Sequence, residues 1–242
     1  MFPNTVSFNN LYLDKKIFEA FLYKNIHTLI FNNVGATGHL KLPQSVEVLH
    51  INDFYGSFYD FIGVKELYIT KYIGEKILLP SSLEKYEGKI EYTNGDLPNS
   101  LKYIKLHNTE KFTRISKFPL KLKELIIMGK YDISDQNNLN KKLEKLEIYN
   151  LSSSYEKKII LKINNLPLLK YLKLFIDIDK FSDISNDFLN DISLNLEYVE
   201  LHLIKKNENK IFIKLHDLNI KKIILDGIYP NNINYEGKLI YN

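Results

Sequence analysis

Two stretches of the chain, LPQSVEVLHI at Leu42–Ile51 and LPNSLKYIKL at Leu97–Leu106, share a spacing of apolar residues that decides the fold. The last six residues of each follow the pattern h-x-x-L-x-L, in which h and L are aliphatic or similar. Ten segments fit this motif closely or loosely, and successive copies start 18 to 27 residues apart. Their first residues are Ile26, Val46, Val64, Leu83, Leu101, Leu122, Leu143, Leu169, Leu196 and Ile220. A period of this length indicates a stack of repeats.

The motif describes a strand that cannot be stable alone. Its fourth and sixth residues lie on one face of an extended strand, because side chains alternate along it. A single strand cannot bury this apolar row, so neighbouring copies must stack and share one core. We therefore expect a solenoid, α/β to mainly β, built on a curved parallel β-sheet of about ten strands. Short outer strands, turns and one or two short helices would connect them.

One copy departs from the motif. LEKYEG at Leu83–Gly88 places Tyr86 and Gly88 where leucines are expected. The strand of this copy is therefore open to a shifted interpretation, in which Ile90 and Tyr92 fill the interior instead.

The connections between copies carry their own signals. Prolines precede several strands, where a fixed φ and a missing N–H suit a chain turning into a sheet. They are Pro43, Pro80, Pro98 and Pro119. Apolar spacing predicts a short outer helix over Asp183–Ser193, and residues 157–163 and 210–215 are predicted outer strands. The sequence GATG at Gly35–Gly38 lacks the Gly-Lys-Ser/Thr of a phosphate loop and is predicted to be a turn.

The two ends differ from the repeats. Asp14 is a candidate N-cap for a helix over KKIFEAFLYK. The apolar face of this helix would consist of Ile17, Phe18, Phe21 and Leu22. We thus expect a capping segment at 1–25, about ten repeats at 26–229, and a capping strand at 230–242, where YEGKLIYN resembles the YEGKIEY that starts at Tyr86.

The chain resembles the leucine-rich-repeat superfamily, and most closely its FNIP-type branch. That branch uses LP-x-S-[LV]-x-x-L-x-[LIF], which Leu42–Ile51 and Leu97–Leu106 fit throughout, while Leu79–Gly88 fits in part. The general pattern spans roughly residues 26–225, and the FNIP-like part covers only the first half. The resemblance implies a solenoid that mediates protein–protein contacts. FNIP-like proteins are common in amoebae and in the large DNA viruses that infect them.

The composition narrows the range of functions. Hydrophobic residues make up 45%, the net charge is +4, and Arg114 is the single arginine, so a dedicated nucleic-acid surface is not expected. The chain has no cysteine, which excludes disulfides, Cys-ligated zinc and thiol catalysis. The sequence shows neither a signal peptide nor an apolar run long enough to span a membrane, so we expect a cytoplasmic protein.

The third, fifth and seventh residues of each copy should point away from the core and form three columns of exposed side chains. Aromatic groups gather in these columns from the fifth copy to the ninth, and they form the candidate partner-binding surface. They are Tyr103, His107, Tyr149, Tyr171, Phe175, Tyr198 and His202. Tyrosine and phenylalanine are enriched at interface hot spots, although they also shield exposed sheets by cross-strand packing. Charges that alternate at Glu147, Lys173 and Glu200 are better explained by strand-to-strand stabilisation than by a charged ligand.

Candidate catalytic or metal-binding groups do not converge in the sequence. His50 and His107 would lie about 14 Å apart at the usual strand spacing, too far for one metal or for a nucleophile–base pair. The acidic run from Asp177 to Asp191 lacks the glycine and terminal glutamate of an EF-hand and fits a solvated helix face. We therefore predict no catalytic residue, no metal, no cofactor and no enzyme activity.

Three functions remain as hypotheses. The first is a non-catalytic protein-binding scaffold that uses the concave face of the solenoid. The second is a structural component of a larger assembly, such as a viral particle. The third is polyanion binding through lysines near the C-terminus, which are Lys205, Lys206, Lys210, Lys214, Lys221 and Lys222.

Overall fold

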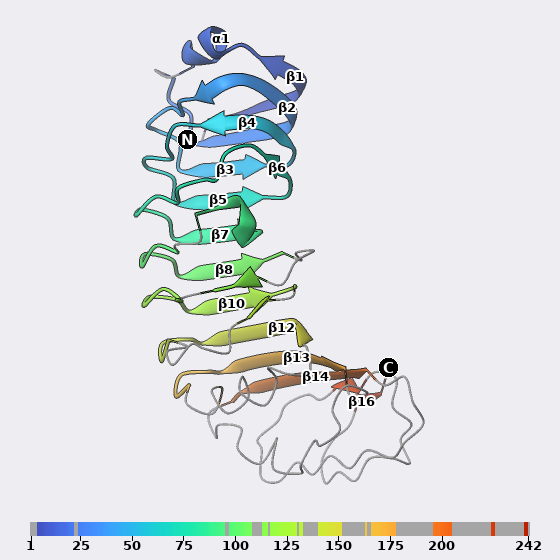
Figure 1. Ribbon diagram of the computed structural model, residues 1–242. Coiled ribbons are helices and arrows are strands. Elements are labelled where there is room, and N and C mark those ends of the chain that lie inside the picture. Colours follow the sequence, from blue (N-terminus) through green and yellow to red (C-terminus); the bar gives the residue numbers. More distant parts are fainter. Residues whose placement is uncertain are drawn as a thin grey trace. The chain divides into compact units, whose positions relative to one another are not determined.

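The chain forms a parallel β-solenoid with very little helix (Figure 1). The computed structural model describes residues 4–21, 24–94, 97–107, 113–115, 117–129, 131–132, 140–151, 163, 166–177, 196–204, 224–225 and 240–241. Every strand pair whose register is defined within these residues is parallel. The chain divides into two compact units, residues 1–109 with 119–122, and residues 110–118 with 123–242.

The first unit contains two sets of parallel strands, and one long strand pairs with both sets. Its elements are β1 (Thr5–Leu13), α1 (Lys15–Glu19), β2 (Thr28–Leu40), β3 (Val48–Ile51), β4 (Phe54–Phe58), β5 (Glu66–Ile69), β6 (Tyr72–Ile73), β7 (Lys85–Gly88), the 3₁₀ turn η1 (Ile90–Tyr92) and β8 (Tyr103–Leu106). The strand order is β8-β7-β5-β3-β2-β4-β6, and β1 also pairs with β2. We call the strands that carry the h-x-x-L-x-L motif the motif strands.

Strand β2 turns a corner and serves both sets of strands. Its first part pairs with β3, and its second part, from Val34 on, pairs with β4. Asn33 at the corner has a φ of 53°, and Asn10 in β1 has a φ of 52°, a left-handed conformation that asparagine tolerates. The segment Gly35–Gly38 lies inside β2, so the predicted turn there is wrong. Gly38 (φ 67°) falls where the β2–β4 register shifts, which accounts for the glycine without a turn.

The predicted core positions are confirmed. Each residue at the first, fourth and sixth motif positions whose side chain the structure describes is buried. The fourth-position side chains are all 0% exposed: Leu29, Leu49, Leu67, Tyr86, Ile104, Leu125, Leu146, Leu172 and Val199. Burial of one such side chain contributes roughly 1.5–3 kcal/mol. The repetition of this row from copy to copy holds each unit together.

The irregular copy keeps its register. Tyr86 is 0% exposed and aligns with Leu67 on one side and Ile104 on the other, so the predicted shift to Ile90 and Tyr92 is wrong. The tyrosine hydroxyl donates to the Lys89 carbonyl at 2.7 Å. A Cβ atom at Gly88 would lie 2.9 Å from that hydroxyl. The large ring thus occupies the space that a leucine at the sixth position would fill, and glycine makes the room.

The connections before the strands are hydrogen-bonded turns. Each proline carbonyl accepts from the N–H of the copy's first residue, at 3.1 or 3.2 Å, in Pro43–Val46, Pro80–Leu83, Pro98–Leu101 and Pro119–Leu122. The serine of three of these copies also donates its hydroxyl to the backbone of the preceding copy. The pairs are Ser45 to Ile26 (2.8 Å), Ser82 to Val64 (2.9 Å) and Ser100 to Leu83 (2.6 Å). The serines therefore tie one coil to the next.

The N-terminal segment contains more than the expected helix. Asp14 caps α1 through its carboxylate, which accepts from the Lys16 N–H at 2.7 Å, as predicted. The helix is only five residues long; Phe18 is buried, but Ile17 is 63% exposed, so its predicted place on the apolar face is wrong. The sequence reading also missed β1, although SFNN at Ser7–Asn10 repeats in IFNN of β2.

The second unit continues the motif, and its last three motif strands are longer than its first. Its elements are β9 (Thr113–Arg114), β10 (Glu124–Ile127), β11 (Tyr131–Asp132), β12 (Lys145–Leu151), β13 (Tyr171–Asp177), β14 (Tyr198–Ile204), β15 (Ile224–Leu225) and β16 (Ile240–Tyr241). The order β14-β13-β12-β10 forms the motif sheet, while β9 pairs with β11 and β15 with β16. The predicted outer helix at 183–193 lies outside the described residues, as do the outer strands at 157–163, apart from Ile163, and at 210–215. In the described parts of the chain, no helix has the length and apolarity needed to cross a bilayer.

Candidate functional site

The exposed columns of the motif strands follow the predicted register. In the second unit the third-position residues Lys145, Tyr171 and Tyr198 are direct partners in neighbouring strands. The fifth-position residues Glu147, Lys173 and Glu200 are partners in the same way, as are Phe175 and His202 at the seventh position. In-register parallel pairing places identical motif positions side by side, so each column becomes a row of touching side chains.

Aromatic rings in the second unit form two stacks. Tyr149 stacks on Phe175 with ring centroids 4.6 Å apart, and Phe175 stacks on His202 at 3.9 Å. Tyr171 and Tyr198 stack at 4.6 Å, with only 5° between the ring planes. All five rings are partly exposed. We call these residues, together with the charged fifth-position row between them, the β12–β14 face.

The fifth-position row lies between the two stacks and is unusually buried for charged groups. Glu147 and Glu200 are each 7% exposed. Glu200 contacts Lys173 at 2.9 Å and accepts from the Tyr198 hydroxyl at 2.9 Å and from His202. Burial, the largest influence, raises the pKa of Glu200, but the hydrogen bonds from these three side chains and the Lys173 charge outweigh it and lower the pKa to about 2.

The lysines complete the network. Lys145 contacts Glu147 at 2.9 Å and lies over the Tyr171 ring at 5.1 Å from its centroid. Lys173 lies 5.3 Å from the centroid of Phe175. Cation–π contacts of this kind are worth about 0.5–2 kcal/mol, depending on how far they are desolvated. Each charge on the face thus has an opposite charge and a ring beside it.

The tyrosine hydroxyls of the face are not poised for chemistry. The Tyr149 hydroxyl donates to Glu147 at 2.7 Å. Burial and this hydrogen bond raise the pKa of Tyr149, and burial with the charges of Glu147 and Glu200 raises that of Tyr171. Neither phenol ionises near neutral pH, so neither can act as a nucleophile or base there.

The other two predicted site residues belong to the first unit. Tyr103 lies in β8, and the Lys85 ammonium lies 4.7 Å from its ring centroid. His107 follows the end of β8, where its N–H donates to the Gly88 carbonyl at 3.0 Å and burial lowers its pKa. The structure therefore brings five of the seven predicted residues together in the second unit and places these two in the first.

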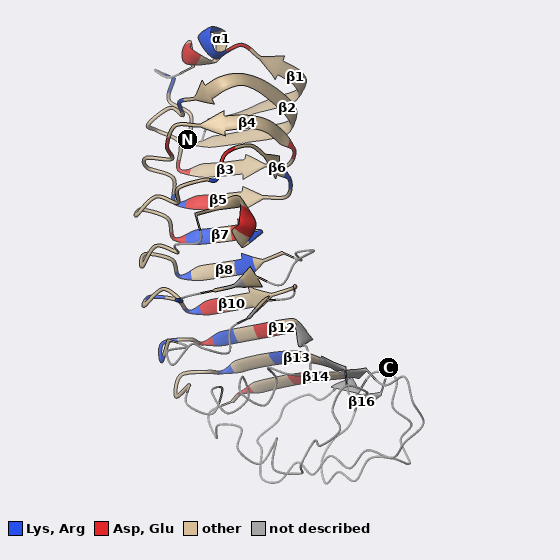
Figure 2. Ribbon diagram, in the orientation of Figure 1, with Lys and Arg blue, Asp and Glu red and all other residues tan. Residues whose placement is uncertain are grey.

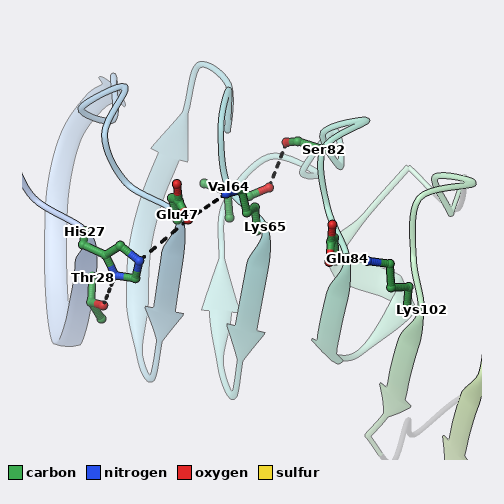
Figure 3. Close-up of polar contacts among 8 residues, drawn as sticks. All are labelled: His27, Thr28, Glu47, Val64, Lys65, Ser82, Glu84 and Lys102. Atoms are coloured by element: carbon green, nitrogen blue, oxygen red, sulfur yellow. Dashed lines mark hydrogen bonds and ion pairs between the residues drawn. The ribbon is translucent and has the colours of Figure 1, made fainter. Parts of the chain in front are cut away.

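Two features of the exposed surface were missed in the sequence. His50 and Tyr68, fifth-position neighbours, stack at 4.4 Å with 4° between their planes, and burial lowers the pKa of His50. The second motif positions form a separate row of charges along the edge where the strands begin, and their signs alternate within each unit (Figures 2 and 3). Its contacts are His27–Glu47 (3.7 Å), Lys65–Glu47 (2.9 Å), Lys102–Glu84 (2.7 Å), Lys123–Glu144 (2.9 Å) and Lys170–Glu197 (3.5 Å). Alternating signs at the second positions were the available signal.

Two other predictions concern metal binding and the lysines near the C-terminus. Among the described residues, no group of three or more His, Asp or Glu side chains could hold a metal ion. The lysines of the polyanion hypothesis lie outside the described residues, and so does the acidic run after Asp177.

Comparison with known proteins found no match. No family model matches the chain, and no curated protein or solved structure does so either. The geometry of the solenoid and of the β12–β14 face is therefore the whole basis for a functional interpretation.

Proposed function

We propose that the chain is a solenoid of the leucine-rich-repeat type that binds another protein, without catalysis, through the β12–β14 face. The repeat assignment rests on the motif, on the LP-x-S turns and on the serine bonds between coils. The choice of face rests on one observation: five stacked, partly exposed rings enclose two glutamates that are each 7% exposed.

Several physical arguments support this choice. Stacked rings offer a large contact area and lose little conformational entropy when a partner binds, because neighbouring rings already restrict their motion. At the same motif position in β7, the side chain of Glu87 is 19% exposed, against 9% for the side chains of Glu147 and Glu200, and its ion-pair contacts are longer, at 3.6 and 3.7 Å. The tighter network is thus a local property of β12–β14.

The test replaces Tyr149, Tyr171 and Phe175 together with alanine. The matched control replaces His50 and Tyr68, which form the stacked pair of the first unit. Partners would be captured from the native cell by each tagged protein, cross-linked and quantified by mass spectrometry, at a temperature where circular dichroism shows every variant folded. We expect the triple variant to lose at least nine-tenths of the partner signal and the control to keep it. Capture that is equal in all three proteins would rule out this face.

A further inference from the structure

Strand β1 is an edge strand with little protection. It pairs with β2, and no strand among the described residues pairs with its other edge. Exposed edges are usually guarded by charged residues, proline or a covering element. The nine residues TVSFNNLYL of β1 contain neither a charge nor a proline. Helix α1 instead covers the end of the core, where the Phe18 ring lies 5.7 Å from Phe8 and 6.0 Å from Phe31.

The backbone of β1 has a defined outward set of groups. The Asn4 carbonyl accepts from the Thr28 N–H, which places Asn4 and then every second residue on the side facing β2. By alternation, the N–H and C=O groups of Ser7 and Asn9 point away from β2. An extended segment that arrives at this edge would therefore meet a standard parallel hydrogen-bonding pattern.

Hydrogen bonds between asparagine side chains all donate in one direction, toward this edge. Along the seventh motif position, the Asn52 amide donates to the Asn32 oxygen and the Asn32 amide donates to the Asn9 oxygen, both at 2.6 Å. Beside it, the Asn33 amide donates to the Asn10 oxygen at 3.0 Å. Both ladders run in the same direction and end at β1. The amide nitrogens of Asn9 and Asn10 donate to no residue that the structure describes.

We infer that the edge of β1 binds an extended segment of another protein, which pairs parallel to β1 and offers side-chain oxygen acceptors, as asparagine does, to Asn9 and Asn10. A second copy joined about a two-fold axis fits less well. It would place amide donors against amide donors, because the Asn9 oxygen already accepts from Asn32 and from the Ser7 hydroxyl. The residues beyond the corner add apolar contact, since Leu11 is 39% and Tyr12 69% exposed.

The probe is a synthetic peptide with the sequence of β1, TVSFNNLYL, extended by two lysines for solubility and a fluorophore. A parallel in-register copy of β1 supplies an asparagine oxygen opposite each open donor. We expect saturable binding by fluorescence anisotropy, at least tenfold stronger than that of a peptide with both asparagines replaced by leucine. Binding of the two peptides with equal affinity would overturn the role of the asparagine ladders, and no binding would overturn the whole inference.

Variants of the protein locate the binding edge. Ser7→Pro removes an outward N–H and the hydroxyl that accepts from Asn32, but leaves the β1–β2 backbone hydrogen bonds in place. Asn9→Asp keeps the acceptor for Asn32 but removes the open donor. Each should weaken peptide binding at least tenfold, whereas Ser7→Ala, which loses the same hydroxyl and keeps the N–H, should stay within twofold of the wild type. Unchanged affinity for Ser7→Pro would place the peptide elsewhere.

Two further measurements determine the direction of the bound peptide and whether a second copy of the chain binds this edge. A nitroxide at the N-terminus of the peptide should broaden NMR signals near Thr5 more than those near Leu13; the reverse would overturn parallel pairing. In analytical ultracentrifugation the wild-type protein should show no dimer that Ser7→Pro abolishes. Such a dimer would assign the edge to a second copy of the chain. The triple alanine variant of the β12–β14 face should bind the peptide normally, which separates this inference from the proposed function.

Discussion

The motif strands of the two units use the same six-residue pattern but end differently. Strands β5, β7 and β8 of the first unit, like β10 of the second, are four residues long and stop at the sixth motif position, so their seventh-position residues lie beyond the strand. Strands β12, β13 and β14 are seven residues long and keep the seventh position within the strand. Only there do three seventh-position rings, Tyr149, Phe175 and His202, stack in succession.

This difference bears on how a column of exposed side chains comes into contact across neighbouring strands. Strand pairing holds equivalent residues at about 4.8 Å, close to the separation of stacked rings. Phe175 and His202 inherit that spacing as register partners, and Tyr149 stacks on Phe175 although the β12–β13 register shifts between Ile148 and Leu151. The stack of rings therefore also depends on which residues occupy the seventh positions, since the first unit has Asn32, Asn52, Thr70 and Lys89 in four of them.

The largest effect is expected when the buried residues Tyr86 and Gly88 of β7 are replaced singly with leucine. A second-unit strand such as β13 has Leu172 and Leu174 at the same motif positions. Tyr86→Leu should lower the free energy of unfolding by about 4 kcal/mol, because Gly88 leaves the vacated space empty. Gly88→Leu alone should cost about 3 kcal/mol, since its Cβ would lie 2.9 Å from the Tyr86 hydroxyl and 3.2 Å from both the Cβ and the carbonyl oxygen of Ile69. The double variant should return to within about 1.5 kcal/mol of the wild type. Urea unfolding measures all three, and additive single effects would refute the exchange of volume between the two positions.

Acid should distinguish the glutamates of the two units. Glu200 has a pKa of about 2 in the folded chain, against about 4.3 in an unfolded one. Because the folded carboxylate binds its proton more weakly, its stabilisation is complete above about pH 4.3 and disappears as the pH falls toward 2. The loss amounts to about 3 kcal/mol.

The measurement is urea unfolding from pH 6 to pH 2.5 for the wild type, Glu200→Gln and Glu87→Gln. The first two curves should converge as the pH falls. Glu87→Gln should follow the wild type throughout, because the side chain of Glu87 is 19% exposed and its ion pairs are longer. A constant gap between wild type and Glu200→Gln would contradict the network around Glu200.

The hydrogen bonds that serines make between coils occur in the first unit. In the copies that start at Leu143 and Leu169, the residue before the first motif position is Lys142 or Leu168 instead of serine. Ser82→Ala removes the bond to the Val64 carbonyl and should cost about 1 kcal/mol in urea unfolding. The adjacent, exposed Ser81 provides the control, because Ser81→Ala should change stability by only a few tenths of a kcal/mol. Equal effects at the two positions would show that the Ser82 hydrogen bond does not stabilise the repeat.

The smallest effect is expected where the two units are alike, in the charge row at the second motif positions. Lys102 and Glu84 are about half exposed although their charged atoms lie 2.7 Å apart, and Lys123 with Glu144 is similar. Lys102→Ala and Lys123→Ala should each shift the melting temperature by about 1 °C, and less in 1 M NaCl. A shift of several degrees in calorimetry would show that this row stabilises the fold.

The sequence by itself determined the solenoid, the identity of the buried residues and the register of the exposed columns. These follow from alternation along a strand and from the spacing of copies, which are properties of the chain read in one dimension. The strand β1 was within reach as well, through the repeated Phe-Asn-Asn, but its copy lacks the leucines that define the others.

Only the tertiary structure decided how the residues of neighbouring copies fill space together. It showed Tyr86 placed over Gly88, glutamates at 7% exposure between stacked rings, and asparagine ladders that end with open donors at β1. Each of these depends on the distance and orientation of side chains far apart in sequence. Local patterns do not encode that information, because the same lysine and glutamate at the third and fifth positions of β7 and β12 leave the glutamate side chain 19% exposed in one strand and 9% in the other.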